Sequence, residues 1–219
     1  MKYIKQFFLF ILTSFIAYNL QAQVPVREEP HHKPVLENNY VRLLDVHLNA
    51  GDTTQYHIHA TPSVIVFISN SFMGAQLTGK APAAPNEVFP AQTLFVDYGT
   101  NPITHRVYNT GNNVFHVMDI ELLKPAPAQD SCAALSQSNL QPASNEKLAN
   151  VYKLNLDKDG SLSLPAGNCA YLAICISGEI VSANKKIKEG EYIFFDPGNT
   201  IKLTNQQEKK ATCVLLQLK

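Results

Sequence analysis

The chain of 219 residues contains no tryptophan, no run of basic residues and no cysteine pair at the two-residue spacing of zinc sites. Eighteen basic side chains balance eighteen acidic ones, which argues against the strongly positive surface that binds nucleic acid. No amphipathic pattern of three or more helical turns occurs, which argues against a helical domain. Tyrosine, phenylalanine, valine and isoleucine are plentiful, and 45% of the residues are hydrophobic. The composition predicts an ordered protein with a packed core, built mainly from strands.

The first 22 residues differ from the rest of the chain. Lys2 and Lys5 precede an apolar run over residues 7–17. The run is too short to cross a membrane, so the pattern predicts a cleaved signal peptide over residues 1–22. An uncleaved N-terminal anchor is the alternative. After cleavage the chain would carry a net charge of about −2, have no stable membrane span, and be periplasmic or secreted.

The four cysteines are Cys132, Cys169, Cys175 and Cys213. Export would place them in an oxidising compartment, where disulfides persist. Four cysteines allow three complete pairings, and the sequence does not choose among them. Buried free thiols on strands are an equally good interpretation.

Short apolar or alternating segments separated by turn residues recur along the chain, a pattern typical of a β-sandwich or β-barrel. Residues 23–37 are polar and contain three prolines, which indicates an extended arm. Residues 124–150 are rich in proline, alanine and serine, which indicates a linker with one short helix near 131–137. The candidate strands span residues 41–48, 55–59, 63–69, 93–97, 105–108, 114–122, 151–156, 161–164, 170–177, 179–182, 192–195, 201–204 and 212–218.

An internal repeat accounts for the two halves. The segment 93–99 aligns with 192–198, and His105-Arg-Val-Tyr-Asn109 aligns with Ile201-Lys-Leu-Thr-Asn205. Two related β-barrels in tandem follow, over residues 35–123 and 151–219. The second barrel has isoleucine where the first has His105, so only the first could hold a metal in this way.

All seven histidines lie before residue 117. His57 and His59 are two residues apart, and residues two apart on a strand point to the same face. A third imidazole, from His105 on a neighbouring strand, would complete a set of three nitrogen donors for a divalent transition metal. Histidines that serve core packing or the surface are the alternative.

The other histidines are expected to have smaller roles. His31 and His32 lie on the polar arm and are predicted to be solvated. His47 is interpreted as structural, while His116 could orient a ligand imidazole from the last strand of the first barrel.

The spacing Gly51-x5-His57-Ile-His59, followed by His105-x3-Asn109, resembles the two short motifs of the cupin superfamily. The resemblance covers about residues 35–123, with a weaker echo over about 150–219. It implies an all-β protein of two tandem antiparallel jelly-roll barrels, the second degenerate, following the signal peptide. It also implies a metal at the barrel mouth, held by the residues that match the motif histidines.

The chain departs from the cupin pattern at one ligand. Most metal-binding cupins have a glutamate four or five residues after the second histidine, where this chain has Ser63 and Val64. Some cupin dioxygenases, the thiol dioxygenases among them, resemble this site in using three histidines and no carboxylate. The second half also looks like the terminal barrel of type I mannose-6-phosphate isomerases, a likeness of fold only.

Three neutral imidazoles leave the charge of a divalent ion uncompensated, so the open side of the site should attract an anionic or chelating oxygen. Iron, manganese, nickel, copper and zinc all suit these donors. The hypothesis is an exported metal-dependent oxidoreductase, of dioxygenase type, for a small anionic or phenolic substrate. Tyr56 and Tyr98 could donate a proton to substrate or could simply pack at the barrel rim. A non-catalytic periplasmic binding module for a small ligand or metal is the alternative, and a homodimer is suggested by analogy with other cupins.

Overall fold

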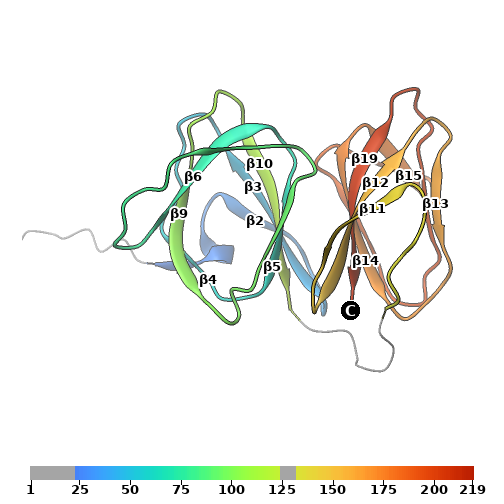
Figure 1. The fold of residues 1–219 in the computed structure, drawn as a ribbon, viewed down its shortest axis with the longest axis horizontal. Helices are drawn as coiled ribbons and strands as arrows, with labels where there is room; N and C mark the ends of the chain where they lie inside the picture. Colours follow the sequence, from blue (N-terminus) through green and yellow to red (C-terminus); the bar gives the residue numbers. More distant parts are fainter. Residues whose placement is uncertain (1–22, 124–131) are drawn as a thin grey trace, which may run out of the picture.

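The computed structural model describes residues 23–123 and 132–219, so the predicted signal peptide lies outside the described residues. The prediction of an all-β protein is confirmed. Four β-sheets, in which the strand pairs other than β1 (Val24–Pro25) with β4 (His57–His59) are antiparallel, form two adjacent barrels, seen side by side in Figure 1. Within the described part of the chain, the helical structure is one 3-10 turn, η1 (Val26–Glu28), and no helix there is long and apolar enough to cross a membrane.

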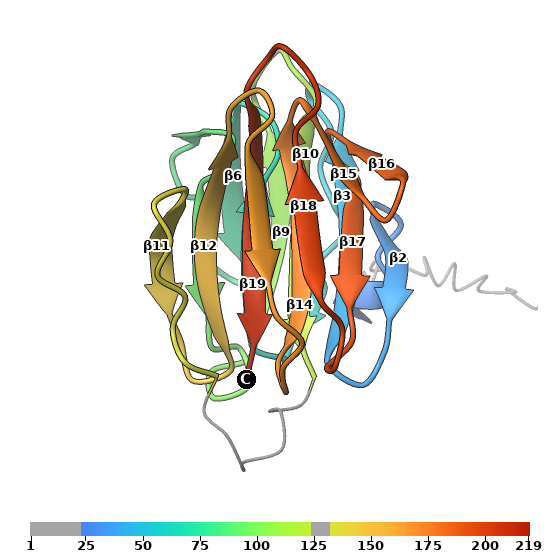
Figure 2. The same cartoon turned by 90° about the vertical axis from the view of Figure 1, so that its right-hand side faces the viewer.

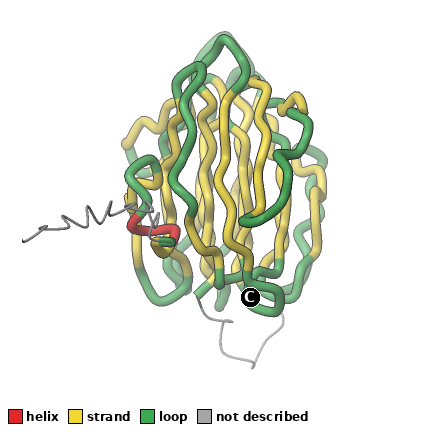
Figure 3. The backbone as a smooth tube through the Cα atoms, turned by 90° about the vertical axis from the view of Figure 1, so that its left-hand side faces the viewer, coloured by secondary structure: helices red, strands yellow, loops and turns green. Residues whose placement is uncertain are grey.

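The first barrel consists of two five-stranded sheets. The sheet that faces away from the second barrel, here called the outer sheet, is viewed in Figure 3. Its strands, in spatial order, are β1 (Val24–Pro25), β4 (His57–His59), β9 (Ile103–Asn109), β6 (Ser71–Leu77) and β7 (Asn86–Val88). The strands of the inner sheet are β2 (His32–Glu37), β3 (Val41–Leu48), β10 (Phe115–Leu122), β5 (Ser63–Phe67) and β8 (Thr93–Val96).

The second barrel has the same two-sheet construction and is viewed from its free side in Figure 2. The strands of its inner sheet are β11 (Leu140–Asn145), β12 (Ala149–Leu156), β19 (Ala211–Leu218), β14 (Ala170–Ser177) and β17 (Tyr192–Phe195). The strands of its outer sheet are β13 (Ser161–Leu164), β18 (Ile201–Thr204), β15 (Glu179–Ser182) and β16 (Lys185–Lys188).

Side-chain alternation along the inner strands builds one core inside each barrel and a third core between the barrels. On β10, Phe115 and Val117 pack inside the first barrel, while Met118 and Ile120 belong to the core between the barrels. That central core also takes Leu172 and other buried residues from the inner sheet of the second barrel. Because successive strand residues point to opposite faces, each inner sheet serves two cores at once.

The sequence repeat corresponds to a repeat of contacts. The Asn109 side chain donates to the carbonyls of Leu48 and Asn113, and the Asn205 side chain donates in the same way to Leu156 and Lys209. The two asparagines therefore close equivalent turns in the two barrels. Asn109 therefore acts as a turn residue.

Two segments that were interpreted as an arm and a linker contain sheet strands. β2 lies at the edge of the first inner sheet, so this barrel begins before residue 35. β11 lies at the edge of the second inner sheet, within the expected linker 124–150, and residues 132–137 form no helix. Both strands contain a proline, Pro34 and Pro142, next to an irregularity in the register. Proline lacks the amide proton for a second ladder, so it is tolerated at an edge or a bulge, and its presence did not exclude a strand.

Candidate metal centre

The predicted histidine triad is brought together by the pairing of β4 with β9. His57 lies directly opposite His105 across the antiparallel ladder, and His59 follows on the same face of β4. The ring centroids of His57 and His59 are 4.9 Å apart, those of His57 and His105 are 4.8 Å apart, and those of His59 and His105 are 4.9 Å apart. The three imidazoles therefore form a compact, nearly equilateral cluster inside the first barrel.

A fourth imidazole, that of His32 on β2, joins this cluster. Its ring centroid lies 4.6 Å from that of His57 and 6.2 Å from that of His59, and its side chain is only 6% exposed. The prediction that His32 is solvated was wrong, because the residues before it fold back over the barrel as β1 and η1. Donor nitrogens of His32, His57 and His59 lie within 4.8 Å of one another, while His105 completes the cluster through its ring contacts.

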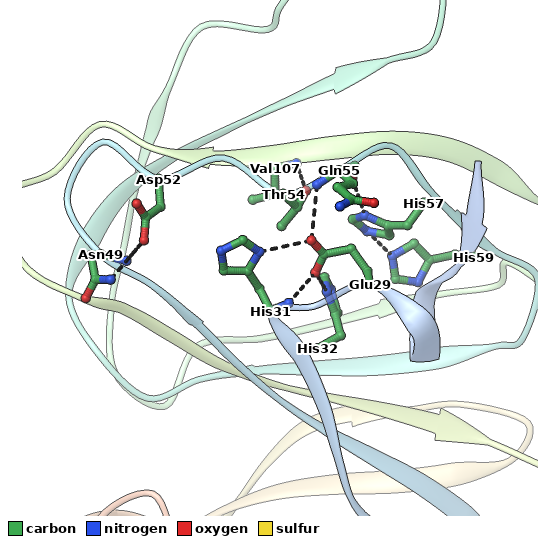
Figure 4. A network of polar contacts seen from close by, with 10 residues as sticks. All are labelled: Glu29, His31, His32, Asn49, Asp52, Thr54, Gln55, His57, His59 and Val107. Carbon is green, nitrogen blue, oxygen red and sulfur yellow. Dashed lines mark hydrogen bonds and ion pairs between the residues drawn. The ribbon is translucent and has the colours of Figure 1, made fainter. Parts of the chain in front are cut away.

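The buried carboxylate of Glu29 fixes the orientation of His32 (Figure 4). It accepts hydrogen bonds from Nδ1 of His32 at 2.7 Å and from Nδ1 of His31 at 2.9 Å, and also from the backbone amides of His31 and Gln55. Burial raises the pKa of Glu29, but the hydrogen bonds from His32 and His31 outweigh it and lower the pKa to about 2. An ionised carboxylate only accepts, so Nδ1 of His32 carries a proton and Nε2 is the atom available to a metal.

The same argument assigns the proton on His57. Its Nδ1 lies 2.9 Å from the carbonyl oxygen of Gln55, which can only accept, so Nδ1 donates and Nε2 of the neutral ring has a free lone pair. Burial lowers the pKa of His57 to about 3, with the nearby His32 and His105 adding to the effect. Burial also lowers the pKa of His59 to about 2 and that of His105 to about 4. These three imidazoles are therefore neutral at neutral pH, the form that binds metal.

Several polar atoms of the cluster have no partner within the described residues. Nε2 of His105 and Nδ1 of His59 are buried without a hydrogen bond, and Nε2 of His57 lies 3.1 Å from Nε2 of His59. If His59 carries its proton on Nδ1, two lone pairs face each other at that distance. A cation between them would remove the repulsion and satisfy both nitrogens. The donor set therefore fits a divalent transition metal.

A cavity of about 270 Å³ opens beside the cluster, between the two sheets of the first barrel. Its polar lining comes from His32, His59, His105, Tyr98 and Asp119. The rest of the wall is apolar and is formed by Val46, Ile65, Phe67, Met73, Ala75, Leu94, Val107, Phe115 and Val117. Such a cavity suits a small, mainly apolar molecule with one polar end next to the histidines.

The two predicted proton donors lie in different places. Tyr98 is buried in the cavity wall, where its ring stacks on that of His59 with centroids 4.6 Å apart. Burial raises the pKa of Tyr98, and the nearby Asp119 adds to this, so its phenol keeps its proton. Tyr56 is not among the cavity-lining residues, and its ring instead lies under the Arg106 guanidinium at 5.2 Å. Tyr98 is therefore the tyrosine that can meet a ligand.

Asp119 is a site residue that the sequence analysis missed. It lies on β10, facing into the barrel, and its Oδ2 is 3.5 Å from Nδ1 of His59. Neither carboxylate oxygen has a hydrogen-bond partner among the described residues, since the Ser63 hydroxyl donates to the carbonyl of Thr61 instead. Burial raises the pKa of Asp119 to about 7, with Glu121 adding to the effect. The cavity thus contains a carboxyl group that can hold a proton near neutral pH.

The second barrel lacks this chemistry at the equivalent positions. The repeat places Ile201 where the first barrel has His105, and Ile201 pairs across the ladder with Leu164. Both residues are buried in the core of the second barrel. A leucine–isoleucine pair therefore replaces the His57–His105 pair, and this barrel offers no imidazole there.

Known proteins resemble this chain in their three-dimensional structure. No protein-family model and no curated protein matches the chain. Among solved structures, the bacterial pirin YhhW from Escherichia coli in complex with nickel(II) has a TM-score of 0.62 at 15% identity, covering 85% of this chain and 90% of that chain. AerE from Microcystis aeruginosa has a TM-score of 0.59 at 12% identity, covering 87% and 98%. The E. coli protein YlbA has a TM-score of 0.61 at 12% identity, covering 87% and 85%. The chain therefore has the cupin fold, as the motif resemblance predicts.

Proposed function

We propose that the chain is an exported, metal-dependent cupin protein whose first barrel holds a divalent transition metal. His57, His59 and His105 would be ligands, and His32 would add a fourth nitrogen from the N-terminal arm. The observation that carries the proposal is the meeting of four imidazoles around unpartnered, buried nitrogen atoms. The proton positions on His32 and His57, set by Glu29 and the Gln55 carbonyl, leave the Nε2 lone pair of both rings available to a metal.

The metal would act as a Lewis acid toward an oxygen of the ligand and, if redox-active, would allow chemistry with dioxygen. Iron, manganese, nickel, copper and zinc all accept imidazole donors, and the nickel complex of pirin YhhW supports a metal of this group. Tyr98 would donate a hydrogen bond to the bound molecule from the cavity wall. Asp119 would hold a proton beside Nδ1 of His59, and the apolar wall would exclude water.

The cavity favours a small phenolic compound or a similar, mainly apolar molecule with a chelating oxygen. An apolar wall stabilises the body of such a molecule, and a cationic centre at one end stabilises an anionic oxygen. Dioxygenase-type oxidation is the reaction class that we propose. Its oxidant is dioxygen, which a redox-active metal centre with a coordination position facing the cavity can accommodate.

Metal analysis of wild type and of His105→Ile tests the metal centre. The variant installs the residue that the second barrel uses at the equivalent position, so folding should be retained. We expect it to contain one metal equivalent less than wild type per chain. An unchanged metal content, with an unchanged binding constant, would contradict the proposed ligand set.

Oxygen uptake tests the reaction. Protein loaded separately with iron, manganese, nickel or copper is mixed with a panel of chelating phenols, and dioxygen consumption is followed. We expect turnover with at least one metal, and none with His105→Ile. Metal binding without oxygen consumption on any of these compounds would contradict the dioxygenase proposal.

A non-catalytic binding module is the second candidate, and the position of His32 favours it. A fourth imidazole occupies a position that substrate or dioxygen would otherwise use. A ligand that raises the melting temperature of the metal-loaded protein without being converted would support this function.

Export is supported by the disulfide between Cys132 and Cys169, since structural disulfides persist in oxidising compartments. Cell fractionation and the mass of the mature chain test it, and a chain that begins at Gln23 in the periplasmic or secreted fraction is the expected result. A homodimer stays a prediction, which light scattering of the purified protein can check.

A further inference from the structure

We infer that the chain carries a second divalent-metal site, formed by Asp45, His47 and His116 on the opposite face of the inner sheet. β3 and β10 pair in antiparallel fashion, and His116 lies directly opposite His47. Asp45 is two residues from His47 and therefore points to the same face. On these strands Leu43 and Met118 share that face and belong to the core between the barrels. The cluster thus lies at the rim of the central core, away from the cavity inside the first barrel.

Donor atoms of three side chains lie close together in this cluster. Nε2 of His116 lies 2.8 Å from Oδ1 of Asp45, and Nδ1 of His47 lies 3.5 Å from the same oxygen. Donor atoms of the three side chains all lie within 4.8 Å of one another. Two imidazoles and one carboxylate are a donor set that zinc, nickel, copper and iron accept. A metal would take the place of the hydrogen bond between His116 and Asp45, with the neutral His116 ring carrying its proton on Nδ1.

The two imidazoles are held in place before any metal binds. The rings of His47 and His116 are stacked, with centroids 3.9 Å apart and an interplanar angle of 23°. Gly190 of the second barrel closes against His116, and a Cβ atom at this position would lie 2.8 Å from Cε1 of the ring. Because glycine has no side chain and adopts the positive φ of 77° at this turn, the backbone of the second barrel can pack directly against the His116 ring. Preorganised ligands lose less conformational entropy on binding.

The site is open to solvent on one side. The side chains of His47, Asp45 and His116 are 45%, 23% and 16% exposed, so an ion can enter and water can fill the remaining positions. Lys33 on β2 pairs with Asp45 in the ladder, and this cation should weaken metal binding. We therefore expect the second site to bind more weakly than the buried centre inside the barrel.

Zinc titration of the tag-free mature chain, followed by calorimetry, tests the inference. We expect two equivalents of zinc, and at least a tenfold loss of affinity for the weaker one in His47→Gln and in His116→Gln. The His105→Ile variant should keep the weaker equivalent, so failure of the barrel centre and failure of this site are distinguishable. Lys33→Gln should tighten the weaker equivalent about sevenfold, as for a unit charge removed ~7 Å from a divalent ion in water.

Lys80→Gln, which removes an exposed lysine from the loop after β6, is the matched control and should leave both equivalents unchanged. His47 is largely exposed, so its replacement should leave folding intact, which a melt of the metal-free protein can verify. A wild type in which no bound equivalent is weakened by His47→Gln or by His116→Gln would overturn the inference, whether it binds one equivalent or two. An anomalous difference peak between the three side chains in zinc-soaked crystals would support it directly.

Discussion

Glu29 is the buried acid that sets the chemistry of the N-terminal arm. Its carboxylate holds Nδ1 of both His31 and His32, and the pKa of about 2 keeps it charged at all ordinary pH values. In Glu29→Gln the amide can donate as well as accept, so the proton on His32 is no longer confined to Nδ1. We expect the affinity of the barrel centre for zinc to fall about 10- to 100-fold, as for other residues that orient metal ligands. Competition with a chromophoric chelator would measure it.

The neighbouring Glu28 provides the control for this prediction. Its side chain is 56% exposed, and its carboxylate lies 3.8 Å from Nε of Arg27 at the surface. Glu28→Gln should leave zinc affinity unchanged. If Glu29→Gln also binds zinc as wild type does, the orientation of His32 does not contribute to the metal centre.

The buried histidines predict a loss of stability in acid for the metal-free protein. His57, His59 and His105 have folded pKa values of about 3, 2 and 4, all lowered from 6.5, so the unfolded chain binds protons that the folded protein does not. Their contribution to stability is therefore present above pH 6.5 and is lost as the pH falls toward 4. Each proton taken up by the unfolded chain alone weakens folding by about 1.4 kcal/mol per pH unit. Urea unfolding at pH 7 and pH 5 would measure this.

Asp119 has the opposite effect on how the stability of the metal-free protein depends on pH. Its folded pKa of about 7 lies above the reference value of 3.8, so its contribution to stability is present below pH 3.8 and is lost as the pH rises to 7. Acidification from pH 7 to 5 therefore lets Asp119 offset part of the loss that the histidines cause. In Asp119→Asn this offset is removed, and the fall in stability between pH 7 and 5 should be steeper than in wild type. Parallel curves for the two proteins would show that Asp119 does not titrate in this range.

At the scale of the strands, the sequence predicted most elements of both barrels, but not β1, β2, β6, β7, β11 and β16. Of these six strands, all except β6 lie at the edge of a sheet. The predicted strands show alternating or continuous apolar residues, because one or both faces are buried. An edge strand has a neighbour on one side only, so it tolerates proline and polar residues. β2 and β11 show this composition, with single buried residues at their starts, and local patterns did not separate them from an extended arm or linker.

The same physics explains which site residues could be predicted. His57 and His59 share a strand, where a period of two is visible in the sequence, and the repeat located His105 on an equivalent strand. His32 reaches them only through the fold of β1 and η1, and sequence spacing carries no signal of that contact. Asp119 faces the cavity because of the register of β10 against β3 and β5. The alternation of apolar residues along β10 does not by itself indicate that an acidic residue on the same strand is buried.

The pairing of the cysteines could not be assigned from the sequence. Cys132 precedes β11 and Cys169 precedes β14, and the two are bonded, whereas Cys175 and Cys213 are buried free thiols opposite each other on β14 and β19. We expect two thiols per chain to react with a thiol reagent in urea without reductant, and four after reduction. Peptide mapping should find the linked pair. Four reactive thiols in the unreduced protein would contradict this pairing.

At the scale of the whole molecule, the two barrels share one core and should unfold together. The central core takes buried residues from both inner sheets, Leu43 and Met118 from the first barrel and Leu172 and Val214 from the second among them. Removal of one inner sheet would expose this apolar surface to water. The barrel without histidines at the equivalent positions therefore stabilises the barrel that contains the candidate metal centre.

Leu172→Ala tests this coupling, because Leu172 lies in the second barrel and is completely buried in the central core. We expect a loss of about 2–5 kcal/mol in the free energy of unfolding, the usual cost of a leucine-to-alanine cavity. Cobalt absorption would report on the metal centre of the first barrel, and far-ultraviolet circular dichroism on both barrels. The two signals should change at the same urea concentrations, and both midpoints should fall in the variant.

Leu77→Ala is the control, because Leu77 lies in the first barrel and is 45% exposed. It should change the free energy of unfolding by no more than about 0.5 kcal/mol. A cobalt midpoint that Leu172→Ala leaves unchanged would mean that the first barrel keeps its structure and its metal without support from the second.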